Sequence, residues 1–160
     1  MTSRKVLIFG NSASGKSTLA KQLAASDELA HLDLDTLAWL PTNPPSRRDV
    51  GESGEGISKF IDGNNGWVIE GCYTDLLELA EPFSTEIIFL DLPVDACIEN
   101  ARNRPWEPHK YESKAAQDAN LEMLIGWIQQ YETRDDVFSR QEHAGFYDRY
   151  DRSKQRLTSN

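Results

Sequence analysis

The chain reads VLIFGNSASGKS from Val6 to Ser17. Four apolar residues come first, and a short continuous apolar run is typical of a parallel strand that is buried on both faces. The run ends at Gly10, and a turn rich in small residues leads through Gly15 to Lys16, where a segment with helical spacing of its leucines begins. A strand, a glycine-containing turn and a helix in this order predict an α/β fold built around a parallel sheet.

The turn fits the pattern G-x-x-x-x-G-K-[ST] at every fixed position. Its glycines let the backbone curl so that successive N–H groups point inward and cradle phosphate oxygens. The following helix adds the positive end of its dipole, Lys16 adds a mobile charge and Ser17 offers a hydroxyl to Mg²⁺. A chance Gly/Ser-rich turn is the alternative, but the strand before it and the helix after it argue against chance. The pattern predicts ATP binding by Gly10, Asn11, Ser12, Ala13, Ser14, Gly15, Lys16, Ser17 and Thr18.

The rest of the chain alternates between apolar runs and helical patterns. We expect further strands at residues 31–34, 67–69, 87–90 and 155–158. We expect helices at residues 16–25, 57–61, 73–81, 94–103, 114–131 and 137–150, with a loop at 41–50. This alternation predicts one three-layer α/β/α domain over residues 1–160, with about five parallel strands. Ligands of such sheets bind beyond the carboxyl ends of the strands, so the residues that close each strand are the candidates for chemistry.

Composition limits the partners that we expect. The hydrophobic fraction of 39% and the charged fraction of 27% are ordinary for a globular domain. The formal net charge is −9, and the acidic groups gather in residues 26–95, which in the simplest interpretation is a solvated surface. Such a chain offers no general attraction for nucleic acid or for anionic lipid. It also has no apolar run near the roughly 20 residues of a membrane span, so we expect neither nucleic acid nor membrane as a partner.

The first residues run directly into a strand-like segment, so we expect no secretory signal. Cys72 and Cys97 are interpreted as free thiols in a reducing, cytoplasmic setting. His and Cys residues show no zinc-ligand spacing. A monomer and a homodimer are both compatible with the sequence.

Carboxylates follow three of the expected strands. Asp33 and Asp35 flank Leu34, where one is suited to hold Mg²⁺ and the other to orient or deprotonate an acceptor hydroxyl, unless both are solvated loop acids. Asp91 closes the strand at 87–90 and is either a metal-binding carboxylate or a structural one. Glu70 closes the strand at 67–69 and either lines an acceptor pocket or belongs to a simple turn.

Basic groups gather in two places. Residues 103–113 follow a helix and combine Arg104 and Lys110 with aromatic residues and prolines, which suits a lid that brings cations to phosphate and excludes water. A surface connection with ordinary charges is the alternative. Arg47 and Arg48 lie in the expected 41–50 loop, where they either hold an anionic acceptor or remain solvated. Further cations that could reach the cleft are Arg134, Arg140, His143 and Lys154.

Three stretches make the chain resemble small P-loop kinases of the adenylate kinase and shikimate kinase type. They are the phosphate loop at 10–18, the segment 87–93 with the helix that ends near Arg102 and Arg104, and the D-x-D spacing of Asp33 and Asp35. The segments 67–73 and 104–111 also resemble bacterial proteins labelled as small ATPases or as shikimate-kinase-like. An adenylate kinase-like strand order is what the resemblance implies.

The resemblance also implies roles for individual residues. Ser17, Asp33 and Asp91 are then candidates for Mg²⁺, Asp35 meets the acceptor, and Arg102 and Arg104 contact ATP, with Arg104 as the catalytic lid arginine beside Lys16. Asn100 departs from the family, which has an arginine one helical turn before Arg104. The implied activity is transfer of a phosphoryl group from Mg·ATP to a nucleotide or a shikimate-like hydroxy metabolite. Asn100 favours an alternative, a regulatory protein that binds ATP and hydrolyses it slowly without an acceptor.

Overall fold

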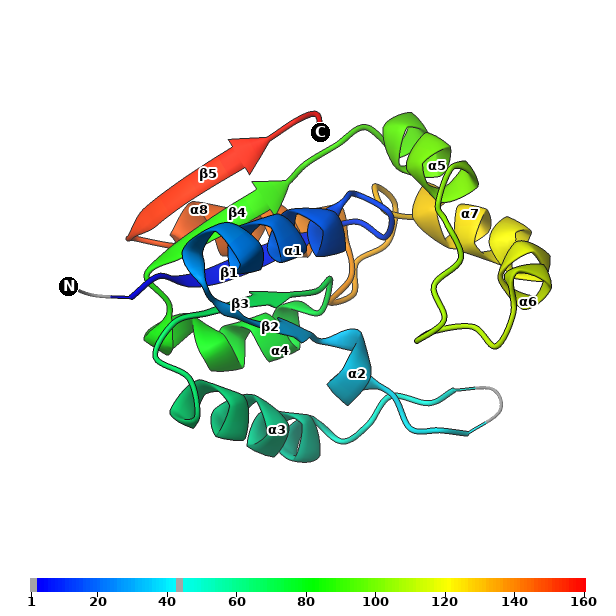
Figure 1. Cartoon of the computed structure of the whole chain (residues 1–160). Coiled ribbons are helices and arrows are strands. Elements are labelled where there is room, and N and C mark those ends of the chain that lie inside the picture. Colours follow the sequence, from blue (N-terminus) through cyan, green and yellow to red (C-terminus); the bar gives the residue numbers. More distant parts are fainter. Residues whose placement is uncertain (1–2, 43–44) are drawn as a thin grey trace.

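The structure is a computed structural model that describes residues 3–42 and 45–160 (Figure 1). Its centre is a five-stranded sheet in the order β2-β3-β1-β4-β5, and every pair of neighbours is parallel. The strands are β1 (Lys5–Gly10), β2 (Ala30–Asp33), β3 (Trp67–Glu70), β4 (Glu86–Leu90) and β5 (Ser153–Leu157). This confirms the predicted α/β class with a parallel sheet.

Helices cover both faces of the sheet (Figure 1). Their bounds are α1 (Lys16–Asp27), α2 (Asp35–Ala38), α3 (Val50–Asp62), α4 (Thr74–Ala80), the 3₁₀ turn η1 (Glu81–Phe83), α5 (Val94–Arg102), α6 (Lys114–Ala119), α7 (Leu121–Gln129) and α8 (Arg140–Arg149). None of the helices in the described ranges combines the length and the apolar character that crossing a membrane requires.

Alternate residues of β1 point to opposite faces of the sheet and enter two separate apolar cores. Leu7 and Phe9 belong to the core that α3, α4 and α8 complete, whereas Val6 and Ile8 belong to the core that α1, α5 and α7 complete. All four side chains are fully buried. Burial on both faces explains why the strand is continuously apolar, and it agrees with the position of β1 as the central strand of the sheet.

The structure corrects the expected helix at 114–131. Two helices replace it, because the chain turns at Asn120, whose Nδ2 donates to the hydroxyl of Tyr111 at 3.0 Å. Another difference is that α3 begins at Val50 rather than near residue 57. Asp49 caps this helix by accepting a hydrogen bond from the N–H of Gly51, and the cap offsets the weak helix propensity of the glycines that follow.

His143 of α8 lies in the core rather than in a cleft. It is fully buried against Phe9 and Phe89. Its Nε2 donates to the carbonyl oxygen of Cys72 at 2.8 Å, and its Nδ1 accepts from the hydroxyl of Tyr131 at 2.7 Å. Burial lowers the pKa of His143 from 6.5 to about 4, so the neutral imidazole is the form that the fold contains.

Acidification is expected to destabilise the protein through His143. Because the folded pKa lies below the unfolded value, the stabilisation is complete above pH 6.5 and is lost as the pH falls toward 4. The loss at pH 4 from this group is about 3 kcal/mol. Urea unfolding of wild type and of His143→Gln between pH 4 and pH 7 measures it. Equal pH slopes in the two proteins would contradict the assignment, since both share the carboxylates that also titrate.

Candidate active site

The turn between β1 and α1 depends on its two glycines. Gly10 has a φ of +155°, and a Cβ at this position would lie 2.5 Å from the carbonyl oxygen of Leu90 in β4. Gly15 has a φ of +95° and caps the N-terminus of α1. Residues with a side chain rarely adopt either backbone conformation, and at Gly10 the contact with Leu90 leaves no room for a side chain. The spacing of the motif is therefore a geometric requirement of this turn.

Side chains hold the turn in place around the N-terminus of α1. Asn11 accepts a hydrogen bond at Oδ1 from the N–H of Ser12 at 2.8 Å, and its Nδ2 donates to the carbonyl oxygen of Ile128 at 3.3 Å. Lys16 Nζ donates to the carbonyl oxygen of Asn11 at 2.7 Å. The lysine thus folds back along its own loop, with its ammonium group beside the backbone that would receive phosphate.

A cavity of about 690 Å³ opens in front of this loop. Three groups of residues supply most of its lining. The loop and α1 contribute Ser12, Ala13, Gly15, Lys16, Ser17 and Thr18. The ends of β2 and β3 contribute Asp33, Asp35, Glu70, Gly71 and Cys72. Segment 103–113 contributes Asn103, Arg104, Pro105, Glu107, Lys110 and Tyr111. The volume is within the range of about 300–1,000 Å³ that is usual for small-molecule sites.

The cavity brings together most of the residues that the sequence singled out. Lys16, Ser17, Asp33, Asp35 and Arg104 all face it, although they come from three separate segments. Gly10, Asn11 and Ser14 are buried within the loop beneath it. Arg102 is exposed and, within residues 3–42 and 45–160, is not among the residues that line the cavity.

Glu70 is the carboxylate in contact with the phosphate loop. It is 2% exposed; its Oε1 accepts from Ser17 Oγ at 2.9 Å, and its Oε2 lies 2.8 Å from His31 Nε2. The contact between Glu70 and Ser17 is not visible in the sequence, because it depends on the order of the strands in the sheet. The end of β3 comes within reach of Ser17 because β3 lies beside β1 in the sheet.

Asp33 and Asp35 lie next to each other, and their pKa values are shifted in opposite directions. Burial raises the pKa of Asp33, and the carboxylates of Asp35 and Glu70 raise it further, against the opposing effect of Lys110. Burial would also raise the pKa of Asp35, but Lys110 and the hydroxyl of Tyr73 outweigh it and hold that pKa below its ordinary value. Asp35 is thus the carboxylate of the two whose ionised form the surroundings favour, which suits it to accept a hydrogen bond.

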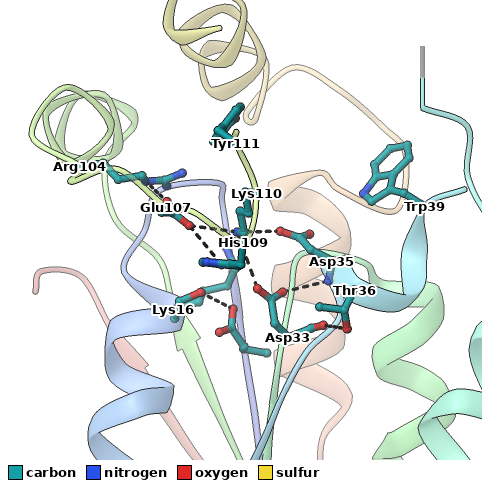
Figure 2. Close-up of polar contacts among 12 residues, drawn as sticks. Lys16, Asp33, Asp35, Thr36, Trp39, Arg104, Glu107, His109, Lys110 and Tyr111 are labelled. Atoms are coloured by element: carbon teal, nitrogen blue, oxygen red, sulfur yellow. Dashed lines mark hydrogen bonds and ion pairs between the residues drawn. The ribbon is translucent and has the colours of Figure 1, made fainter. Parts of the chain in front are cut away.

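Aromatic side chains fix the position of Asp35. The hydroxyl of Tyr73 donates to Asp35 Oδ1, and Trp39 Nε1 donates to the oxygen of Tyr73 at 2.8 Å. Figure 2 shows the other side of Asp35, where Lys110 Nζ donates to Oδ2 at 3.0 Å. The carboxylate is held from both sides, which suits a group that must point at a substrate atom.

Asp91 does not have the surroundings expected of a metal ligand. It is buried, with Arg140 Nη2 at 2.9 Å and Arg156 Nε at 2.8 Å from its Oδ2. Burial alone would raise its pKa, but the two arginines outweigh that effect and lower it. Among the described residues it is not part of the cavity lining. Asp91 ties α8 and β5 to the end of β4, and these contacts give it a structural role.

The other cations that the sequence proposed for the cleft also have internal partners. Arg47 pairs with Asp75 at 3.0 Å and stacks on Tyr73, Arg48 donates to the carbonyl oxygen of Trp39 at 3.1 Å, and Arg134 pairs with Asp136 at 2.9 Å. Lys154 Nζ donates to a backbone carbonyl of α8. Within the described ranges, the lining of the cavity includes none of these residues.

In the part of the chain that the structure describes, no three His, Cys, Asp or Glu side chains are arranged to hold a metal ion. The site does suit a hard cation that brings further ligands with it. Ser17 directs its proton to Glu70, which leaves the lone pairs of the hydroxyl free, and Asp33 adds a carboxylate to the same cavity. Oxygen donors of this kind fit Mg²⁺ whose remaining ligands are water and phosphate.

Comparison with known sequences gives a distant relative of this chain. No family model matches the chain. It is 26% identical over 109 residues to the uncharacterized protein YqaC of Bacillus subtilis (strain 168). The match covers 68% of this chain and 61% of YqaC, so the chain spans about three-fifths of the length of that relative.

Solved structures give the same architecture. A gluconokinase from Sinorhizobium meliloti 1021 superposes with a TM-score of 0.53 at 17% identity, over 86% of this chain and 81% of the kinase. A shikimate kinase from Bacteroides thetaiotaomicron gives 0.53 at 15% identity over 98% and 86%. A sugar kinase from Janibacter sp. HTCC2649 gives 0.51 at 20% identity over 84% and 82%. The chain has the P-loop kinase fold. In this P-loop kinase fold the candidate site lies at the carboxyl ends of β1, β2 and β3, under segment 103–113.

Asp91→Asn separates the structural role of this residue from a metal-binding one. The substitution leaves two arginines without their shared charge, and we expect the free energy of unfolding to fall by about 1–3 kcal/mol. Nucleotide affinity in Mg²⁺ buffer is expected to stay within about twofold, since no cavity contact is lost. Urea unfolding and titration calorimetry measure the two quantities, with the exposed Asp95→Asn as the control. An unchanged stability with a strong loss of Mg²⁺-dependent binding would restore Asp91 as a metal ligand.

Proposed function

We propose that this chain binds ATP with Mg²⁺ and transfers the γ-phosphoryl group to a hydroxyl of a small molecule. The observation that carries the proposal is one cavity in which the phosphate loop, with Lys16, faces the anchored carboxylate of Asp35. The loop accounts for the donor. Asp35, fixed by Tyr73 and lying beyond the loop, accounts for an acceptor, because simple nucleotide binding requires no oriented carboxylate there.

In this proposal the N–H groups of residues 10–17 and the dipole of α1 bind the β- and γ-phosphates, and Lys16 moves from the carbonyl of Asn11 to the transferred group. Ser17 and Asp33 would hold Mg²⁺, with Glu70 orienting Ser17. Bound Mg²⁺ supplies charge neutralisation on the phosphates.

Asp35 accepts the hydrogen bond of the acceptor hydroxyl and directs its oxygen at the γ-phosphorus. As the new P–O bond forms, the bond from the γ-phosphorus to the bridging oxygen breaks, ADP leaves, and the hydroxyl proton passes to Asp35. The barrier falls through positioning and through charge neutralisation, to which a cation of segment 103–113 contributes. Arg104 is the residue that the family resemblance assigns to that cation.

The family resemblance implies a nucleotide or a hydroxy metabolite as the acceptor, and the structure bears on whether an anionic acceptor is held by Arg47. Arg47, which the sequence suggested as a residue that holds an anionic acceptor, is paired with Asp75. An acceptor screen should therefore combine nucleoside monophosphates, hydroxy acids and neutral polyols. ADP release is followed with and without each compound, and ³¹P NMR identifies a phosphorylated product. A phosphorylated product supports the proposal.

Asn100 keeps a second function under consideration. At the position where the family has an arginine, its amide donates to the carbonyl oxygen of Ala13 at 2.9 Å and to Asn160 Oδ1 at 2.8 Å. The side chain therefore braces the phosphate loop instead of offering charge to it. A regulatory protein that binds ATP and hydrolyses it slowly would have this feature. Slow hydrolysis that no acceptor stimulates would favour this alternative.

Lys16→Ala is expected to reduce turnover by about 10³-fold or more, because it removes the charge that follows the transferred group. The fold should remain intact, since the hydrogen bond of the Lys16 side chain goes to the backbone of its own loop. Turnover assays and thermal unfolding measure the two effects, with Lys59→Ala on the exposed side of α3 as the control. Undiminished turnover in Lys16→Ala would refute the assignment of the loop.

Asp35→Asn is expected to slow phosphoryl transfer by about 10²–10⁴-fold, because an amide cannot take the hydroxyl proton. The dissociation constant of ATP should change by less than about threefold, since Asp35 serves the acceptor. Single-turnover kinetics and ATP titration give the two numbers. A parallel loss of both would place Asp35 in the metal site instead.

A further inference from the structure

Segment 103–113 has a defined shape that a side chain of α6 and one of its own side chains maintain. Gln117 of α6 binds it twice, because Oε1 accepts from the N–H of Glu107 at 2.8 Å and Nε2 donates to the carbonyl oxygen of Pro105 at 3.0 Å. Across the loop, Trp106 Nε1 donates to the carbonyl oxygen of Tyr111 at 3.0 Å. These hydrogen bonds fix the conformation of the loop, so the direction of each of its side chains shows which groups it can reach.

The cations of this segment point in different directions (Figure 2). Arg104 turns toward Glu107, with Nε 3.1 Å from Oε1. Lys110 extends into the cavity, where its Nζ lies 3.0 Å from Asp35 Oδ2 and 3.7 Å from Asp33 Oδ2. His109 is more than half exposed and lies 3.6 Å from Glu107. Lys110 is thus the cation that crosses from the loop to the carboxylates at the end of β2.

Lys110 is surrounded by carboxylates in this position. Besides Asp35 and Asp33, its Nζ lies 3.6 Å from Glu107 Oε2. Lys16 of the phosphate loop and Lys110 of segment 103–113 line the same cavity as Asp35. Asp35 therefore shares the cavity with a lysine from each of these two segments.

We infer that Lys110, rather than Arg104, is the cation of segment 103–113 that contacts the transferred phosphoryl group, and that Asp33 and Asp35 hold it in the cavity before nucleotide binds. The inference rests on the proposed function. Asn100 is an uncharged amide that donates to Ala13, and Arg104 pairs with Glu107, whereas Lys110 is the cation of the segment that pairs with Asp33 and Asp35. Lys110 has a flexible stem and partners that entry of Mg²⁺ and of an acceptor would replace. Lys110 would then touch the reacting group, and Arg104 would position Glu107.

The test compares four variants with the wild type. Lys110→Gln removes the charge, Lys110→Arg keeps it, and Arg104→Gln removes the family-type candidate. Lys114→Gln is the control, since Lys114 is exposed and pairs with Asp118 on the next turn of α6. Calorimetry measures the affinity for Mg·ADP with and without aluminium fluoride, which mimics the phosphoryl group in transfer. Hydrogen exchange of residues 103–113 is measured in the nucleotide-free proteins.

In the wild type we expect aluminium fluoride to tighten Mg·ADP binding by about 10²-fold or more. Lys110→Gln should lose at least about tenfold of this tightening while its affinity for Mg·ADP alone changes less than about threefold. Arg104→Gln, Lys110→Arg and Lys114→Gln should retain most of it. Exchange in 103–113 should rise in Lys110→Gln and stay unchanged in Lys114→Gln.

Two results would overturn the inference while leaving the proposed function intact. One is tightening that survives in Lys110→Gln or is lost mainly in Arg104→Gln, and the other is a wild type that binds Mg·ADP without any tightening. A wild type that binds neither Mg·ADP nor Mg·ATP would instead refute the proposed function, and this inference with it.

Discussion

The approach of Gly10 to the carbonyl of Leu90 determines where the candidate site can lie. β1 is the central strand, with β3 and β4 hydrogen-bonded on its two sides, and its last residue must leave the sheet while touching the end of β4. The turn therefore starts in a fixed place and direction, and α1 begins within a few residues of it. Because parallel strands end at the same edge, carboxylates that close β2 and β3 are brought next to the N-terminus of α1 without any further device.

This arrangement creates an electrostatic problem that the chain solves locally. A protein of net charge −9 places Asp33, Asp35 and Glu70 beside a loop shaped for anions. Each carboxylate has a polar partner, since Glu70 is bonded to Ser17 and His31, and Asp33 and Asp35 share Lys110. The cation that pairs with Asp33 and Asp35 thus lies on the wall of the cavity itself. Entry of a phosphate chain with Mg²⁺ exchanges one set of ion pairs for another, which costs less than burying unpaired charge.

The sequence predicted the parts of this structure that depend on local pattern. The apolar runs located the strands, because strands buried on both faces have few polar residues, and the spacing of Gly10, Gly15 and Lys16 fixed the loop, because few sequences can make that turn. Strand β5 has no such apolar run, because it lies at the sheet edge with most of its residues exposed. The break at Asn120 was missed because the apolar spacing continues across it, whereas the contact with Tyr111 that accompanies the break comes from the preceding loop.

The roles of the carboxylates could not be predicted in the same way, because they depend on partners distant in sequence. Glu70 and Asp91 both close strands that flank β1, and by position alone they are equivalent. Arg140 and Arg156 reach Asp91 from α8 and β5, and they convert it into a clamp between elements. Glu70 meets a hydroxyl and an imidazole instead, so it remains beside the cavity as a hydrogen-bond acceptor for Ser17. Whether a carboxylate at a strand end is structural or belongs to the site thus depends on which side chains the fold places next to it. The order of strand ends along the sequence does not show which side chains those are.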